Sequence, residues 1–319
     1  IADRLTDYDF DLITYNMGGN LATEKIGRVN IHRISAPTKF LFPILSFFKG
    51  ISLQKKNKYD VVWSMMANAG FAALGVKLFF KSIKFVMTIQ EGDPIPRIKR
   101  RVWFVYPIFK MMFRRADVVT ALSNYLGEFA KSMGSRNVEV VPNGVDLSNF
   151  KLKSNAGRIQ DYNKIVIIST GRLVKKNAID DVVRSLKFLP ENVVFRSVGS
   201  GEDEDDIKKL VHSLGLENRV GFTSFAYHKE MVRLLESADI FIRPSLSEGL
   251  GNSFLEAMAV GLPIIGTNVG GIPDFLTDSK TGLFCSVNDP KDIAKKVLML
   301  IRDPDLYRSL SVNGRSLIE

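Results

Sequence analysis

Ser245-Leu-Ser-Glu248-Gly249-Leu250-Gly251-Asn252-Ser253-Phe-Leu-Glu256-Ala-Met-Ala-Val-Gly261-Leu-Pro263 is a segment that holds two glutamates eight positions apart. Glu248 stands in a glycine-rich loop, and Glu256 stands one turn into the short helix predicted to follow. Gly261 and the proline after it predict the end of that helix. The first backbone N–H groups of a helix have no partner within it, and the helix dipole adds positive charge there. The loop therefore predicts an anion-binding site.

A carboxylate on either side of an anion site can accept hydrogen bonds from hydroxyl groups. A nucleotide sugar is a ligand of this kind, because its anionic diphosphate lies between two groups that carry hydroxyls. Two simpler explanations stand beside this one. Ser253-x-x-Glu256 fits a capping box, which needs no ligand, and Glu248 on its own fits a solvated loop charge.

The whole segment follows a predicted strand, Asp239-Ile-Phe-Ile-Arg-Pro244, and resembles the E-x7-E motif of family 4 of the retaining GT-B glycosyltransferases. By that resemblance, Glu256 would accept hydrogen bonds from ribose hydroxyls and Glu248 would contact the donor sugar. The backbone amides of Leu250, Gly251, Asn252 and Ser253 would hold the diphosphate.

Composition narrows the choice of fold and chemistry. The chain has 319 residues with 45% apolar content, enough for two domains with separate cores. One cysteine, Cys285, rules out an internal disulfide framework and most cysteine-based metal sites, and it fits a reducing compartment. Three histidines, widely spaced, argue against a histidine-rich metal site. No apolar run reaches membrane-spanning length.

Short apolar strands alternate with helices along the chain, which predicts parallel α/β sheets. The first half predicts helices around 97–114 and 123–133, and strands at 10–15, 60–64, 85–89, 117–121 and 138–141. The second half predicts strands at 164–169, 192–197, 220–222, 239–242, 263–266 and 282–285. The fold class is therefore α/β, and with the resemblance it becomes GT-B: two tandem Rossmann-like doubly wound domains with a cleft between them.

We expect residues 1–148 to form an N-terminal acceptor-side Rossmann-like domain and residues 163–319 to form a C-terminal domain that binds the nucleotide sugar donor. Residues 149–162, within a polar stretch without a clear period, are expected to link them. The first strand of the family and its glycine-rich loop have no counterpart here. We therefore expect the native N-terminal strand and loop to be missing from this sequence.

Two further glycine-containing segments follow strands of the second half. Arg172 and the lysines after it suit phosphate, because arginine offers a two-pronged donor and lysine a point charge. In the family this arginine and a later lysine hold the diphosphate; here Asn177 occupies the usual lysine place, so Lys176, or Lys175, is expected to substitute. Glycines in the next segment allow a ligand or another backbone to approach closely, and the family has similar ones beside the nucleotide; they are Gly199 and Gly201.

The acidic run Glu202–Asp206 resembles a metal site, but acids are also favoured where a helix opens. The family is metal-independent, so we expect no metal and no cofactor, with the nucleotide sugar bound as a substrate.

The first half carries weaker signals. Pro142-Asn143-Gly-Val-Asp146 resembles the last acceptor-domain segment of the family, which makes Asn143 a candidate on the acceptor or sugar side. Where the family commonly has a histidine near the donor sugar, this chain has Gln90. An amide can orient a sugar hydroxyl but cannot act as an acid or a base.

Charge is distributed unevenly. Residues 1–150 carry 21 Lys+Arg and 12 Asp+Glu, and the remainder carries 23 and 22. A cluster of basic residues lies between Arg97 and Arg115. It suits an anionic membrane surface or phosphate, it could suit nucleic acid, and it equally fits a solvated helix face. Apart from Trp103, Phe104 and Tyr106, these charges lack interleaved aromatic stacking positions, which argues against nucleic acid.

These observations predict a retaining, metal-independent glycosyltransferase that moves a hexose-type sugar from a UDP- or GDP-sugar to a glycan or lipid-linked acceptor in cell-envelope glycan synthesis. We expect it in the cytoplasm, peripheral on the inner face of the membrane, with Glu248, Arg172 and Lys176 as catalytic residues. The main alternative is a catalytically lapsed nucleotide-sugar-binding or interaction protein, which the departures at Asn177 and Gln90 favour. A sugar-nucleotide epimerase would need more acid and base side chains.

Overall fold

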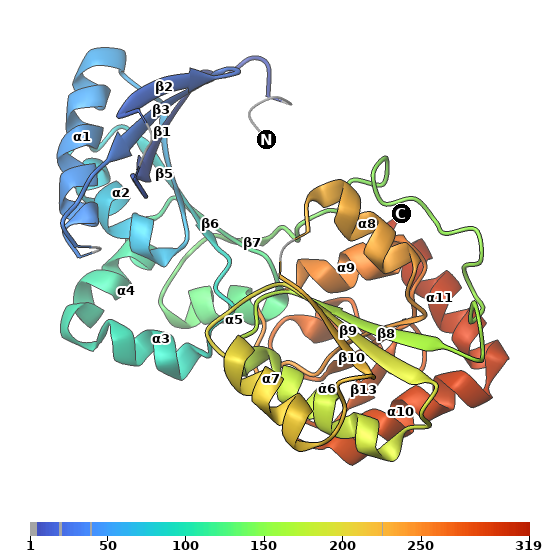
Figure 1. Ribbon diagram of the computed structural model, residues 1–319. Helices are drawn as coiled ribbons and strands as arrows, with labels where there is room; N and C mark the ends of the chain where they lie inside the picture. Colours follow the sequence, from blue (N-terminus) through green and yellow to red (C-terminus); the bar gives the residue numbers. More distant parts are fainter. Residues whose placement is uncertain (1–4, 19–20, 39, 225) are drawn as a thin grey trace. The chain divides into compact units, whose positions relative to one another are not determined.

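The computed structural model describes residues 5–18, 21–38, 40–224 and 226–319, which form two compact units (Figure 1). The N-terminal unit comprises Ile1–Glu91, Pro96–Ala121 and Leu126–Val141. The C-terminal unit comprises Gly92–Ile95, Leu122–Tyr125 and Pro142–Glu319. Each unit contains parallel strands flanked by helices, so both are Rossmann-like.

The strands of the N-terminal unit form two sheets. One has the order β1-β3-β2, in which β1 and β3 are parallel and β2 and β3 form an antiparallel pair. The other has the order β4-β5-β6-β7 and is parallel throughout. The bounds are β1 (Phe10–Tyr15), β2 (Thr23–Ile26), β3 (Val29–Ile34), β4 (Val61–Met65), β5 (Lys84–Ile89), β6 (Val118–Ala121) and β7 (Val138–Val140).

Helices in this part of the chain pack on the parallel sheet and on one another. They are α1 (Phe42–Asn57), α2 (Ala67–Phe79), α3 (Ile95–Arg101), the 3-10 helix η2 (Trp103–Val105), α4 (Tyr106–Arg115) and α5 (Asn124–Ser132). Helix α2 contacts β4, β5, α1 and α4. Three buried phenylalanines join α4 to α5 by edge contacts, with ring centroids 5.3 Å apart for Phe109 and Phe113 and 5.6 Å apart for Phe113 and Phe129.

Two local predictions differ from this structure. The helix predicted around 97–114 is broken into α3, η2 and α4. A proline stands in the first turn of α4, and it cannot donate an N–H, so it suits the start of a helix better than its interior. The hairpin of β2 and β3 was not predicted, although Gly27 has the positive φ of 57° that such a turn requires.

The C-terminal unit contains one parallel sheet of order β10-β9-β8-β11-β12-β13. Its strands are β8 (Ile165–Thr170), β9 (Val193–Val198), β10 (Val220–Thr223), β11 (Ile240–Arg243), β12 (Ile264–Thr267) and β13 (Leu283–Cys285). All six lie within about one residue of the predicted positions. Every residue of β8, β11 and β12 is buried, as expected for parallel strands covered on both faces.

Helices α6 and α7 lie on one face of this sheet and α8 and α9 on the other (Figure 1), as the right-handed rule for parallel crossovers predicts from the strand order. Helix α10 packs on α6, and α11 packs on α9. The bounds are α6 (Ile179–Ser185), α7 (Glu204–Ser213), α8 (His228–Glu236), α9 (Asn252–Ala259), α10 (Pro290–Arg302) and α11 (Pro304–Ile318), with 3-10 helices η3 (Lys175–Asn177), η4 (Leu186–Phe188) and η5 (Ile272–Asp274). The carboxyl ends of β8, β9 and β11 are thus neighbours at one edge, where ligands of such sheets bind.

Candidate active site

The loops after β8 and β9 touch backbone to backbone at this edge of the C-terminal sheet. The N–H of Leu173 donates to Ser200 O at 3.0 Å. A Cβ added to Gly199 would lie 2.0 Å from Gly171 O, and one added to Gly201 would lie 2.1 Å from Leu173 O. Close approach was predicted for both glycines, and the neighbouring loop is what approaches them.

Glu248 is held in the loop after β11 and is not a solvated charge. Its side chain is 13% exposed, and its Oε2 accepts from a guanidinium N–H of Arg243 at 2.7 Å. Its Oε1 accepts from the N–H of Gly249 at 3.0 Å, and its backbone oxygen accepts from the N–H of Gly271 at 3.1 Å. The interpretation of Glu248 as a solvated loop charge is wrong, because a neighbouring buried cation fixes the carboxylate.

Arg243 is the site residue that the sequence analysis missed. It ends β11, is 6% exposed, and donates to Ser253 Oγ at 2.7 Å and to Thr170 O at 3.2 Å. Its guanidinium carbon lies 4.8 Å from the ring centroid of Phe254. Burial lowers the pKa of Arg243 from its ordinary value, and the negative charge of Glu248 opposes that shift. A charged residue closing an apolar strand was the available signal, because such a cation needs a partner nearby.

Helix α9 begins without a side-chain cap. Its N-cap residue is Gly251, with a positive φ of 97°, so Ser253 already lies inside the helix. The capping-box interpretation of Ser253-x-x-Glu256 is therefore wrong. Ser253 directs its oxygen at Arg243 instead, and the charge of Glu256 acts on the same guanidinium. The N-cap residue, a glycine, has no side chain to offer the first N–H groups of α9.

Of the two lysines proposed for the phosphate site, Lys176 lies close to Glu248: a Cβ added to Gly92 would lie 2.5 Å from Lys176 Nζ and 3.2 Å from Glu248 Oε1. Lys176 is half-buried, and its Nζ donates at 2.9 Å to the backbone oxygen of Gly92, which belongs to the same unit. Burial lowers the pKa of Lys176, while the charge of Glu248 acts in the opposite direction. Arg172 and Lys175 are exposed. Asn177 is buried and donates to Arg172 O at 2.7 Å, so it supports the loop that carries the arginine.

The candidates from the first half fall in different units. Asn143 belongs to the C-terminal unit, and its amide donates to Asn252 Oδ1, at the start of α9, at 3.1 Å. Gln90 belongs to the N-terminal unit, where it follows β5. Its backbone N–H donates to Glu91 Oε2 at 3.0 Å.

The acidic run Glu202–Asp206 opens α7, as predicted. The first turn of this helix contains Glu204, Asp205 and Asp206. Lys208 pairs with Glu204 at 2.6 Å, and Lys209 pairs with Asp206 at 3.2 Å. Helix-terminal charge and local ion pairs account for these acids.

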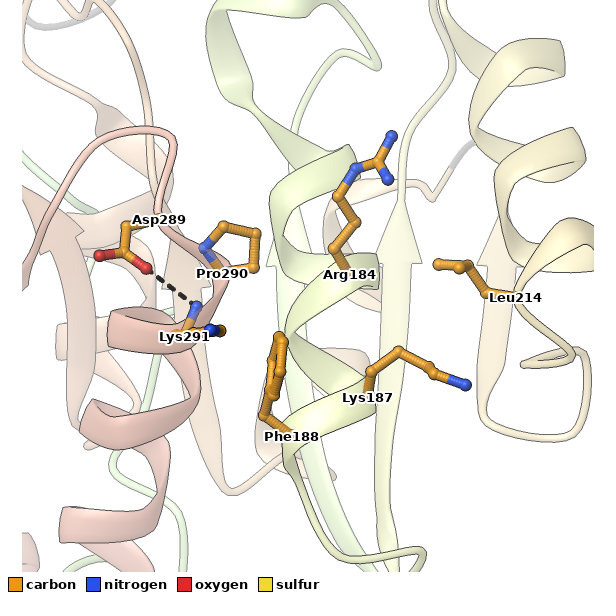
Figure 2. Close-up of a pocket in the computed structure, with 7 residues that line it drawn as sticks. All are labelled: Arg184, Lys187, Phe188, Leu214, Asp289, Pro290 and Lys291. Carbon is orange, nitrogen blue, oxygen red and sulfur yellow. Dashed lines mark hydrogen bonds between the residues drawn. The ribbon is translucent and has the colours of Figure 1, made fainter.

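A hollow of about 390 Å³ lies elsewhere in the C-terminal unit, between η4 and the start of α10 (Figure 2). Asp289 at its rim caps α10, accepting from the N–H of Lys291 at 3.0 Å. None of the predicted donor-binding residues lines this hollow, which is formed by Arg184, Lys187, Phe188, Leu214, Asp289, Pro290 and Lys291.

The basic cluster of the N-terminal unit is exposed together with large apolar side chains. Trp103 is 74% exposed and Phe104 is 59% exposed at the break between α3 and α4. The exposed basic residues are Arg97, Lys99, Arg100, Arg101, Arg114 and Arg115, while Lys110 is partly buried. In the described parts of the chain, no helix combines the length and apolar composition needed to cross a membrane.

Known proteins share this architecture over nearly the whole chain. The sucrose-phosphate synthase of Thermosynechococcus elongatus superposes with a TM-score of 0.84 at 20% identity, covering 97% of this chain and 83% of that one. Anabaena Alr3699/HepE, solved in complex with UDP and glucose, superposes with a TM-score of 0.78 at 18% identity, covering 91% and 82%. These likenesses show the GT-B fold.

A sequence relative is the GDP-mannose-dependent alpha-(1-6)-phosphatidylinositol monomannoside mannosyltransferase of Mycolicibacterium smegmatis. It is 28% identical over 316 residues, which cover 92% of this chain and 80% of the relative. The family model described as Glycosyltransferase Family 4 matches residues 4–149, and the model described as Glycosyl transferases group 1 matches residues 153–317, more than half of the chain. The chain therefore belongs to the group 1 glycosyltransferases of family 4, with the GT-B fold.

Proposed function

We propose that this chain transfers a hexose-type sugar, with retention and without a metal ion, from a UDP- or GDP-sugar to a hydroxyl of a glycan or lipid-linked acceptor. The observation that carries the proposal is a fixed carboxylate, Glu248, in the loop that leads into the start of α9, where the N-cap residue is a glycine. The exposed Arg172 follows the neighbouring strand β8 at the same edge.

The start of α9 suits the diphosphate. Its helix-terminal N–H groups and the positive end of its dipole favour an anion. Arg172 adds a two-pronged donor and Lys176 a half-buried positive charge. The amides from Leu250 to Ser253 complete this set.

The two glutamates suit the hydroxyl-bearing ends of the donor. Glu248 would accept hydrogen bonds from the sugar, and Glu256, on α9, would accept them from the ribose. The solved complex of HepE with UDP and glucose, and the dependence of the mycobacterial relative on GDP-mannose, support a nucleotide sugar as the ligand class.

In the reaction, the bond between the anomeric carbon and the diphosphate oxygen breaks, and its electron pair stays on the diphosphate. The acceptor oxygen forms a bond to the same carbon on the same face, and the hydroxyl proton passes to the departing diphosphate or to solvent. Arg172, Lys176 and the amides of α9 stabilise the charge that grows on the leaving group, where fixed donors are most effective. Two negative charges on a diphosphate are thereby balanced without a metal ion.

The first test is a thermal-shift panel of UDP, GDP, ADP, UDP-glucose, GDP-mannose and ADP-glucose, followed by an assay for release of nucleoside diphosphate. At a ligand concentration of about 100 times Kd, binding should stabilise the fold by roughly 2.7 kcal/mol. Glu256→Ala should lose the shift, and Glu191→Ala, an exposed glutamate at the other edge of the sheet, should keep it. Binding without turnover in the presence of glycan and lipid acceptors would favour the lapsed nucleotide-sugar-binding alternative. No shift with any nucleotide would contradict both.

We also propose that the acceptor is reached at the inner, anionic face of a membrane through the Arg97–Arg115 region. Exposed Trp103 and Phe104 can enter the interface while the surrounding arginines and lysines meet lipid phosphates. The mycobacterial relative acts on a phosphatidylinositol mannoside, which supports a lipid-linked acceptor. Liposome flotation tests this: binding should need anionic vesicles and should drop in the Trp103→Ala, Phe104→Ala double variant. Equal binding to neutral vesicles would contradict it.

A further inference from the structure

Arg243 occupies an unusual place for a charged residue. It closes β11 in the middle of the C-terminal sheet, and its side chain is 7% exposed. A guanidinium taken out of water loses several kcal/mol of hydration unless its donors find partners. An apolar residue would complete the strand as well, so the partners of Arg243 should show why a cation stands there.

Those partners are candidate site residues. One terminal nitrogen donates to Glu248 Oε2 at 2.7 Å, and the other donates to Ser253 Oγ at 2.7 Å. Only the weaker bond, to Thr170 O at 3.2 Å, goes to the backbone. The planar fork of an arginine thus joins the Glu248 loop to the first turn of α9.

A second arginine of the same unit shows what a purely structural role looks like. Arg219 donates only to backbone oxygens, those of Val193, Leu186, Leu189 and Pro190. These bonds tie Arg219, just before β10, to η4 and to the segment that leads into the first residue of β9, at the opposite edge of the sheet. Arg243 instead holds two side chains at the carboxyl edge.

The two bonds have directional consequences. Because Ser253 Oγ accepts from Arg243, the hydroxyl proton of Ser253 is left to donate to another group. Because Oε2 of Glu248 accepts from Arg243 and Oε1 accepts from the N–H of Gly249, the plane of the carboxylate is fixed. One guanidinium therefore sets the donor direction of a hydroxyl and the acceptor directions of a carboxylate.

We propose that Arg243 is a positioning residue that aligns Glu248 with the donor sugar and Ser253 with the diphosphate, so that both parts of a nucleotide sugar are held in one geometry. The proposal rests on the function proposed above. It assigns Ser253 as a hydroxyl donor to a phosphate oxygen. Arg243 itself acts through these two side chains and touches no substrate.

The test compares Arg243→Met and Arg243→Lys with wild type, using the nucleotide sugar that wild type accepts and its nucleoside diphosphate. Lysine keeps a cation but cannot reach Glu248 and Ser253 together, so it tests the fork even where methionine folds poorly. Misplacement of a site group by about 1 Å can cost about 10²-fold in rate. Both variants should therefore lose about 10²-fold in kcat, with a smaller change in Kd for the nucleoside diphosphate.

Two backgrounds separate positioning from general support. In a Glu248→Gln, Ser253→Ala double variant, adding Arg243→Lys should lower kcat by less than about threefold, since its targets are already gone. Arg219→Met should lower the melting temperature but leave kcat and KM as in wild type.

A kcat of Arg243→Lys within about threefold of wild type, or a full 10²-fold loss in the double-variant background, would overturn the positioning role alone. A wild-type chain that neither binds nor turns over any nucleotide sugar would overturn the proposed function, and this inference with it.

Discussion

Both units are Rossmann-like, but they differ in which side chains they bury and which they expose to solvent. In the C-terminal unit the central strands β8, β11 and β12 are buried at every residue, and polar groups such as Arg243 and Asp239 are buried with partners. In the N-terminal unit, β1 and β4 are only partly covered, and most of the exposed large apolar side chains of the described residues lie there. One unit buries charge and the other exposes hydrophobic surface.

This difference matches the two kinds of ligand proposed. A small, highly charged donor needs fixed dipoles and charges, which only a rigid, buried framework can hold in place. A large lipid-linked acceptor at a membrane is better bound by an exposed surface that combines apolar and basic side chains. The net charge of +9 over residues 1–150, against +1 over the rest, follows the same division.

The largest expected effect is on stability, when a buried phenylalanine of the C-terminal unit is compared with an exposed one of the N-terminal unit. Phe241 is fully buried in β11 with its ring 5.0 Å from that of Phe254, so Phe241→Ala should cost about 3–5 kcal/mol of the free energy of unfolding. Phe48 on α1 is 62% exposed, so Phe48→Ala should lower the free energy of unfolding by about 0.5 kcal/mol or less. Urea unfolding should be followed by far-ultraviolet circular dichroism, because both tryptophans lie in the N-terminal unit. An equal loss of the free energy of unfolding in the two variants would contradict the difference in burial between Phe241 and Phe48.

The next effect is on catalysis within the C-terminal unit. Arg172→Met should lower kcat by about 10²–10³-fold, as typically follows the loss of one fixed donor to a developing charge. Because Arg172 is exposed, the melting temperature of the Arg172→Met variant should stay near that of wild type. Lys164→Met, which removes an exposed cation just before the amino end of the same strand β8, is the matched control and should keep most of the rate. Similar losses in both variants would point to general electrostatic attraction instead of a defined contact.

The same division explains what could be predicted from the sequence. Buried parallel strands are short, continuous apolar runs, so all six strands of the C-terminal sheet and the glycine-rich loop around Glu248 were predicted. Arg243 was missed because its role depends on Glu248 and Ser253, which reach it only after the chain turns into α9. Gly199 was predicted to allow close approach, but the sequence could not tell a ligand from the loop at Gly171.

In the N-terminal unit, the strands β1, β4, β5, β6 and β7 were predicted within about one residue, whereas β2 and β3 were missed. The hairpin of β2 and β3 is partly exposed and mixes charged with apolar residues, so it has no clear period. The break between α3 and α4 is set by one proline inside an otherwise helical pattern. Such features depend on local backbone chemistry more than on periodicity.

A smaller effect concerns a buried lysine of the C-terminal unit. Lys153 is 5% exposed, donates to Ala238 O at 2.9 Å, and lies near Asp239; burial lowers its pKa to about 8. Between about pH 8 and 10.5 the unfolded chain keeps this proton and the folded chain loses it, so the free energy of unfolding should rise with pH. We expect the rise attributable to Lys153 to be roughly 1–3 kcal/mol over that window.

Urea unfolding at pH 7.5 and pH 10 would measure this contribution. Lys153→Met should lose the rise, because the titrating group is gone, whereas the exposed Lys151→Met should keep the wild-type slope. The same slope in all three proteins would show that the folded chain does not bury this charge.

The smallest effect sharpens the comparison on the N-terminal surface. Each lysine or arginine near an anionic membrane is worth about 1 kcal/mol, so Arg100→Gln should weaken binding to anionic vesicles about fivefold and leave stability unchanged. Arg302→Gln removes an equally exposed charge from the C-terminal unit and should leave vesicle binding as in wild type, because membrane attraction acts only within a Debye length of about 10 Å at 0.1 M salt. Vesicle sedimentation at two salt concentrations measures both variants. Equal weakening by the two substitutions would mean that overall charge, not the Arg97–Arg115 region, attracts the protein to the membrane. The proposal that the N-terminal unit meets the acceptor at the membrane through this region would then be contradicted.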